Sequence, residues 1–145
     1  MKSAFIIFSF VLAVSGCAQN TKNNTPKKES ITINNQNTMD LTKISNPTVK
    51  NAIEALQAND KNAWYAFFTD DVTFTDDGRT MNFKSFFDNA FNHKEKFLTI
   101  DQVDNDGKNI TGNFYAGQWG TFKVFFNFHQ QADGKFNRLD IGQAR

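Results

Sequence analysis

The chain has 145 residues, a formal net charge of +1 and an aromatic content of 14%, most of it phenylalanine. This length allows one folded domain with a single core and excludes two. The balanced charge, without a basic stripe, argues against nucleic acid as a partner.

Residues 1–17, MKSAFIIFSFVLAVSGC, have a basic start, an apolar run from Ala4 to Val14 and an end made of small residues. The run is too short for a permanent transmembrane helix, so the segment is predicted to be a secretory signal peptide. Cys17, which closes this leader, is the only cysteine in the chain and therefore has no intrachain disulfide partner.

The order Val14-Ser15-Gly16-Cys17 resembles a bacterial lipobox. The resemblance implies that Cys17 becomes the mature N-terminus and carries acyl chains, which would hold the protein on a membrane of the bacterial cell envelope. Residue 18 is Ala rather than Asp, which favours the outer membrane in the enterobacterial sorting scheme. The alternative is a plain secretory leader with an incidental cysteine.

Residues 18–45 are rich in Asn, Thr, Lys and Ser and contain no aromatic residue. Such a segment buries too little apolar surface to offset its ordering entropy, so we expect a flexible tether here. The folded domain is expected to span 46–145, which holds fourteen of the seventeen phenylalanines and a small excess of acidic over basic residues.

Helical periodicity dominates the first part of this domain. Asn46 is expected to cap a helix that starts at Pro47 and ends in a left-handed turn at Asn59. Asp60 should cap a second helix over residues 61–68, KNAWYAFF, whose apolar stripe includes Trp64.

A short strand with alternating Val72 and Phe74 follows, and Asp76-Asp77-Gly78 is expected to turn it. Asn82 should cap a third helix over residues 83–91. Four strand-like runs complete the chain, and turn-forming residues separate them: residues 95–103, 109–116, 120–129 and 135–143. This order predicts an α+β fold with an antiparallel meander.

Two stretches, EALQANDKNAWYAFFTDDVTFTDDG at 54–78 and DGKFNRLDIGQ at 133–143, resemble the SnoaL-like branch of the nuclear transport factor 2-like superfamily. The resemblance implies a strongly curved antiparallel sheet that wraps around three N-terminal helices to form a cone, as in cystatin-like folds. This fold hosts isomerases, cyclases, dehydratases, hydrolases, transport factors and simple binding proteins, so it indicates no reaction.

The strand FKVFFNFH at 122–129 places Phe125 on the face opposite Phe126 and Phe128. The resemblance implies that one face of the strand looks into the cone and that the convex face forms a homodimer, with Phe125 at the interface. The alternatives are that Phe125 is simply exposed or that the tether covers it.

Alternation and the resemblance together predict a cavity in the cone that would bind a mostly apolar ligand. Its expected lining is Trp64, Phe68, Phe74, Phe87, Phe126, Phe128, Leu139 and Ile141, with Asp76, Tyr65 and Trp119 as polar groups. Aromatic stripes also form solid cores, so a cone that is filled by its own side chains is an equal alternative.

The resemblance also allows a test for ketosteroid isomerase chemistry. It places Asp76 at the position of that enzyme's base, but Ala52 and Phe126 stand where the two oxyanion donors are needed. Neither side chain can donate a hydrogen bond, so this isomerisation is rejected. Asp76 remains the candidate general base of another reaction, or an ordinary turn residue before Asp-Gly.

Arg138 and Asp140 resemble the Arg-x-Asp pair of epoxide-hydrolysing members of the superfamily. The alignment that puts Phe126 in the cavity instead leaves both on the convex side, where a surface or interface ion pair is expected.

The sequence contains no motif for a metal site, a catalytic nucleophile or a nucleotide-binding loop. His93 and His129 belong to no metal-binding motif, and there is no nucleophile elbow and no phosphate-binding glycine loop. We therefore expect neither a metal nor a cofactor.

Two functional hypotheses follow. The first is a membrane-tethered domain that binds a small hydrophobic molecule or a partner chain, as a homodimer. The second is a cyclase, dehydratase or hydrolase that acts on an apolar substrate with Asp76 as general base. A pure assembly module that uses the convex sheet is a third possibility.

Overall fold

The computed structural model describes residues 39–145. The leader, Cys17 and tether residues 18–38 lie outside the described residues, so the predictions made for them stay predictions. Within the described part of the chain, no helix is both long enough and apolar enough to cross a membrane.

A curved seven-stranded sheet forms the body of the fold, in the order β2-β1-β7-β6-β5-β3, with β4 paired to β5. Three of these strands are short: β2 (Arg79–Thr80), β3 (Lys96–Phe97) and β4 (Gln102–Asp104). The longest strands of the sheet are β1 (Phe68–Asp76), β5 (Asn109–Tyr115), β6 (Thr121–Gln130) and β7 (Phe136–Gln143). Strands β1 and β7 run parallel, and the other pairs are antiparallel. The predicted meander is therefore confirmed for the second half of the chain.

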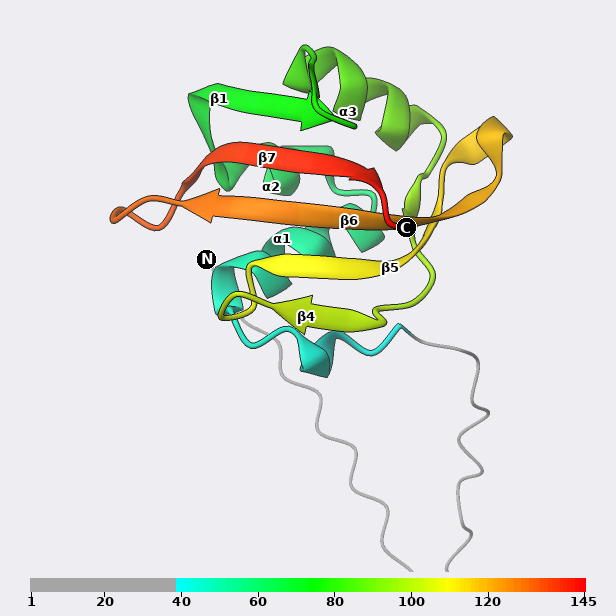
Figure 1. Ribbon diagram of the computed structural model, residues 1–145. Helices are drawn as coiled ribbons and strands as arrows, with labels where there is room; N and C mark the ends of the chain where they lie inside the picture. The colour runs from blue at the N-terminus through cyan, green and yellow to red at the C-terminus, as the bar shows by residue number, and fades with distance from the viewer. Residues whose placement is uncertain (1–38) are drawn as a thin grey trace, which may run out of the picture. The chain divides into compact units, whose positions relative to one another are not determined.

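Three helices pack on one side of this sheet: α1 (Pro47–Gln57), α2 (Lys61–Ala66) and α3 (Phe83–Asn92). Figure 1 shows α1 and α2 behind the sheet and α3 beside β1. The arrangement confirms the α+β fold class, with a curved sheet that wraps around three helices.

The three predicted N-caps form as expected. The side chains of Asn46, Asp60 and Asn82 each accept a hydrogen bond from the backbone N–H three residues on, which satisfies a donor that the helix itself leaves free. Helix α1 ends through Asn59, whose φ of 57° is left-handed as predicted. The N–H of Asp60 returns to the carbonyl of Ala55, as in a Schellman turn.

Helix α2 is shorter than predicted. It ends at Ala66, because Phe68 already starts β1 and pairs with Phe136 of β7. The backbone of Phe67 joins the two elements: its N–H donates to Trp64 and its carbonyl accepts from Phe136. Sheet pairing therefore prevails over the helical periodicity of the last two residues.

The single strand predicted at 95–103 is divided into β3 (Lys96–Phe97) and β4 (Gln102–Asp104). Between them, the N–H groups of Leu98 and Thr99 both donate to the carbonyl of Asn113, so two residues oppose one, as in a β-bulge. Gly112 makes this possible, since a Cβ there would lie 2.0 Å from the Thr99 oxygen.

The packed part of the chain begins before Asn46, the first residue of the expected domain. A short 3₁₀ helix, η1 (Leu41–Lys43), is followed by Ile44, whose side chain is only 4% exposed within the core. The Lys43 ammonium donates to the carbonyl of Ile100 over 2.8 Å. The last residues of the expected tether are thus part of the folded domain.

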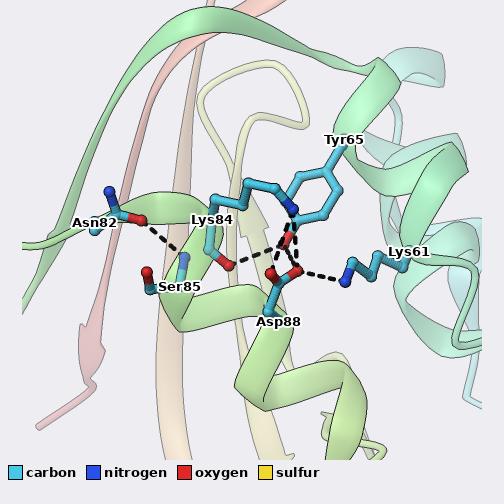
Figure 2. A network of polar contacts seen from close by, with 6 residues as sticks. All are labelled: Lys61, Tyr65, Asn82, Lys84, Ser85 and Asp88. Atoms are coloured by element: carbon cyan, nitrogen blue, oxygen red, sulfur yellow. Dashed lines mark hydrogen bonds and ion pairs between the residues drawn. The ribbon is translucent and has the colours of Figure 1, made fainter.

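A polar network around Asp88 joins α2 to α3 (Figure 2). Asp88 accepts hydrogen bonds from the Tyr65 hydroxyl over 2.8 Å and from the Lys61 ammonium over 2.7 Å. Lys84, one turn earlier on α3, lies 3.3 Å from the second carboxylate oxygen. The hydrogen bonds from Lys61, Tyr65 and Lys84 lower the pKa of Asp88 to about 2.

The network makes the stability of the fold depend on pH in the acidic range. A pKa in the folded state below the ordinary value means that Asp88 stabilises the fold at neutral pH, and this contribution disappears as the pH falls from about 4 to about 2. We expect Asp88→Asn to lower the urea midpoint at pH 7 by a modest amount, because the carboxylate is partly exposed. The deficit should shrink as the pH is lowered.

The matched control is Asp71→Asn, which removes the same charge from β1. Asp71 is exposed and forms no side-chain hydrogen bond or ion pair with residues 39–145. Urea unfolding followed by circular dichroism between about pH 7 and about pH 2.5 measures both variants. A deficit for Asp88→Asn that stays constant across this range would contradict the assigned network.

Candidate functional site

A pocket of about 380 Å³ lies between α3 and the inner face of β5, β6 and β7. The connection from β5 to β6, which contains the 3₁₀ helix η2 (Gly117–Trp119), rises toward α3 in Figure 1 and contributes to the rim. Six aromatic residues contribute to its walls: Phe86, Phe87, Phe114, Trp119, Phe122 and Phe126. Such a volume and lining are typical of a site for a small, mostly apolar molecule.

The predicted cavity residues separate into two groups. Phe87, Phe126 and Ile141 line the pocket, together with Asp76 and Trp119. The other five are not part of its lining and are at most 3% exposed: Trp64, Phe68, Phe74, Phe128 and Leu139.

These five side chains belong to a packed core beneath the pocket. The Trp64 ring lies 4.9 Å from the ring of Phe68 and 4.8 Å from that of Phe87, centroid to centroid. The interior is therefore packed solid around Trp64 and hollow between α3 and the sheet, so each of the two alternatives for the interior describes a part of it.

Asp76 is the last residue of β1 and pairs in register with Ile141 of β7. The turn that follows is formed by Asp77 and Gly78, both with positive φ, and the Asp77 carboxylate accepts from the N–H of Gln143 over 2.9 Å. Asp77 thus carries out the turn function, and Asp76 has no side-chain hydrogen bond to any residue between 39 and 145. Its carboxyl group lines the pocket instead.

The environment of Asp76 disfavours its charge. Partial burial raises the pKa of the Asp76 carboxyl, and the neighbouring Asp77 raises it further, whereas Arg79 acts in the opposite direction. A carboxyl group of this kind can accept or donate a proton closer to neutral pH than an exposed aspartate.

Glu95 is a second pocket carboxyl that the sequence analysis did not identify. It is only 7% exposed, it lines the pocket, and neither oxygen has a hydrogen-bond or ion-pair partner among residues 39–145. Burial raises the pKa of Glu95, while His93 acts to lower it. A lone acid between two lysines is typical of an exposed loop, so no sequence motif marked it.

Local geometry explains why Glu95 points inward. Helix α3 ends in a Schellman turn in which Lys94 is left-handed, with a φ of 53°, and the Glu95 N–H returns to the carbonyl of Ala90. Gly117 of η2 packs against this turn, because a Cβ there would lie 2.9 Å from His93 and 3.3 Å from a Glu95 oxygen. The two connections therefore hold Glu95 against the pocket.

Trp119 lies at the pocket mouth. It is the last residue of η2, lines the pocket and is still 70% exposed. A large apolar ring in this position is unusual for a structural residue, since its burial contributes little to the fold.

Two further predicted positions can be placed. Tyr65 is not part of the pocket lining, because its hydroxyl belongs to the Asp88 network. Ala52 is fully buried in α1 and Phe126 is a pocket wall, so neither position offers an oxyanion donor. Among residues 39–145, no three acidic, histidine or cysteine side chains are grouped so that they could hold a metal ion.

The ion pair predicted between Arg138 and Asp140 is confirmed. The Arg138 Nε donates to both carboxylate oxygens over 2.9 Å, on the face of β7 opposite the buried Leu139 and Ile141. The Thr75 hydroxyl and the His129 ring nitrogen also contact this carboxylate, at 2.6 and 2.8 Å. Partial burial acts to raise the pKa of Asp140, but the hydrogen bonds from Thr75, Arg138 and His129 outweigh this effect and lower the pKa.

Phe125 finds a contact within the chain. Its ring lies against Gly142 of β7, where an added Cβ would come within 2.9 Å of two ring carbons. The side chain is consequently half-buried in the monomer, which explains an aromatic residue on the outer face without a partner. The predicted homodimer stays a prediction.

Comparison with known proteins gives matches among solved structures alone. No family model matches the chain, and no curated protein matches it. An NTF2-like protein of unknown function from Cytophaga hutchinsonii aligns with a TM-score of 0.55 at 13% identity, over 75% of this chain and 94% of the other.

Two more structures give the same result. An uncharacterized cystatin fold protein from Novosphingobium aromaticivorans has a TM-score of 0.54 at 18% identity, over 72% and 97% of the two chains. A "putative polyketide cyclase" from Sinorhizobium meliloti has a TM-score of 0.53 at 17% identity, over 65% and 92%. At these identities the likeness concerns architecture, and the chain has the cone-shaped NTF2-like, or cystatin-like, fold.

Proposed function

We propose that this chain is a SnoaL-like binding protein that holds a small, mostly apolar molecule in the pocket between α3 and the sheet. One observation carries the proposal: the aromatic core does not fill the whole interior and leaves about 380 Å³ beside Phe87, Phe126 and Ile141. The cyclase name of the Sinorhizobium meliloti neighbour is consistent with such a ligand.

The proposal is tested by filling the pocket. Val124 is a half-buried pocket residue on β6, and Val124→Trp should occupy the hollow. The neutral dye N-phenyl-1-naphthylamine should gain fluorescence on binding to the native protein, and Val124→Trp should weaken its binding by about tenfold or more. Fluorescence titration at fixed protein concentration measures both affinities.

Val103→Trp is the matched control, because Val103 is also half-buried but lies on β4 outside the pocket lining. It should bind the dye as the native protein does. Equal weakening by both variants, or native protein that leaves the dye dark, would refute binding in this pocket.

The second candidate is an enzyme of the cyclase, dehydratase or hydrolase type. The observation that favours it is the free Asp76 carboxyl, which lines a solvent-connected apolar pocket without a hydrogen-bond partner among the described residues. In this reading Asp76 is the general base, and the buried Glu95 carboxyl supplies or removes a second proton.

A general base in an apolar pocket can be detected with an activated proton-transfer substrate. We expect the native protein to accelerate ring opening of 5-nitrobenzisoxazole, followed by absorbance of the phenolate product. Asp76→Asn should reduce the rate by roughly 10²-fold, while it leaves dye affinity within about twofold. Asp71→Asn should change neither. Equal rates for Asp76→Asn and the native protein would exclude the base.

We also infer that Cys17 is acylated and anchors the domain to the cell envelope, at the outer membrane. The lipobox-like residues before Cys17 and the absence of a second cysteine support this. Several acyl chains together give nearly permanent membrane binding, since each buried methylene contributes about 0.8 kcal/mol.

Cys17→Ser should therefore move the protein from the membrane fraction to the soluble fraction and abolish its labelling by an alkyne fatty acid. The control Asn20→Ser leaves the cysteine in place and should fractionate like the native protein. Retention of Cys17→Ser in the membrane fraction would disprove the anchor.

A further inference from the structure

All charged side chains that line the pocket are acidic. Asp76, Asp77 and Glu95 line it, whereas none of its lining residues is Lys, Arg or His. The remaining polar side chains in the lining, Asn89 and Gln143, carry no charge. The pocket therefore combines aromatic walls with negative charge alone.

Glu95 is the strongest indication that this charge faces a ligand. The residue is only 7% exposed and its carboxylate forms no hydrogen bond within residues 39–145, yet its oxygens are not among the fully buried atoms without a partner. They therefore face solvent, which a ligand in the pocket would replace. His93, on the same connection, acts electrostatically on the Glu95 carboxyl, and Gly117 of η2 packs near one of its oxygens.

Asp76 repeats the pattern at the β1 side of the pocket. The groups that act on its carboxyl are Asp77 and Arg79, and neither forms a hydrogen bond with it. Asp77 is occupied by the N–H of Gln143. Two carboxyl groups, one from the α3–β3 connection and one from β1, thus remain available to the same occupant.

An inorganic cation does not fit this arrangement. Metal ions require several ligands that converge on one point, and no such group exists in the part of the chain that the structure describes. Trp119 adds an exposed indole ring at the mouth of the pocket. Tryptophan is the best aromatic partner for an organic cation.

We infer that the ligand is an organic cation, an apolar molecule that carries a protonated amine or ammonium group. The inference rests on the proposed binding function and specifies the ligand class. The apolar body lies against Phe87 and Phe126, and the cationic group lies between the carboxyls, where it satisfies Glu95 and contacts the Trp119 ring. An anionic ligand, such as a fatty acid, is repelled.

Three probes with one naphthyl body test the ligand class: 2-(1-naphthyl)ethylamine, 2-(1-naphthyl)ethanol and 1-naphthylacetate. In isothermal titration calorimetry at pH 7, the amine should bind roughly tenfold more tightly than the alcohol, and the carboxylate should bind most weakly. Glu95→Gln should remove most of the advantage of the amine and keep alcohol affinity within about twofold. Asp71→Asn should leave all three affinities unchanged.

A pH series on the native protein provides a measurement that does not depend on the folding of a variant. The amine stays charged below pH 8. As the pH is lowered, Glu95 and Asp76 become protonated, so the affinity for the amine should fall while the affinity for the alcohol stays level. His93 lies beside Glu95 on the same connection, so His93→Gln serves as the variant that separates its contribution from that of the carboxyl groups.

The outcomes distinguish this inference from the proposed function. Equal affinity for amine and alcohol, or tighter binding of the carboxylate, would overturn the cationic ligand and leave the apolar pocket intact. Failure of all three probes and of the neutral dye would overturn both. An amine preference that survives Glu95→Gln and does not vary with pH would also count against the assignment.

Discussion

The packing of aromatic rings around Trp64 determines where this fold can be hollow. Trp64 is fully buried, and its ring contacts Phe68, Phe87 and Phe128 from three different elements. Its indole N–H has no hydrogen-bond partner among the described residues, which costs roughly 1–3 kcal/mol. The large buried ring area offsets this cost. Because the interior around Trp64 is solid, the space left for a ligand inside the fold lies between α3 and the sheet.

The residues around the pocket, unlike this core, are not arranged for stability. Two partly buried carboxyl groups near the pocket, those of Asp76 and Glu95, form no side-chain hydrogen bond with residues 39–145, and the large Trp119 side chain is left mostly exposed. None of these features stabilises the free protein. Natural proteins keep such costs mainly at functional sites. The pocket is therefore the part of the described structure that is best suited to bind another molecule.

Periodicity and capping residues predicted most of the fold. Asn46, Asp60 and Asn82 begin the helices as expected, because an N-cap is a local interaction that neighbouring residues decide. The division between β3 and β4 escaped prediction, since it depends on Gly112 accepting the Thr99 carbonyl at close range. The early end of α2 depends on pairing between Phe68 and Phe136, which are distant in sequence.

Prediction of the site was limited in the same way. Alternation correctly indicates which face of a strand looks inward, but it contains no information on depth. Phe126 and Phe128 therefore look equivalent in the sequence, although one lines the pocket and the other is packed beneath it. Glu95 turns inward through a left-handed Lys94, a conformation that no strong sequence signal predicts.

The chain contains two tryptophans, one in the packed core and one at the mouth of the pocket. A ¹H–¹⁵N spectrum of the indole groups therefore reports on both regions at once. Titration with 2-(1-naphthyl)ethylamine should shift the Trp119 indole resonance progressively and leave that of Trp64 nearly in place. A larger shift at Trp64, or no shift at Trp119 at saturating amine, would contradict a ligand site in the pocket.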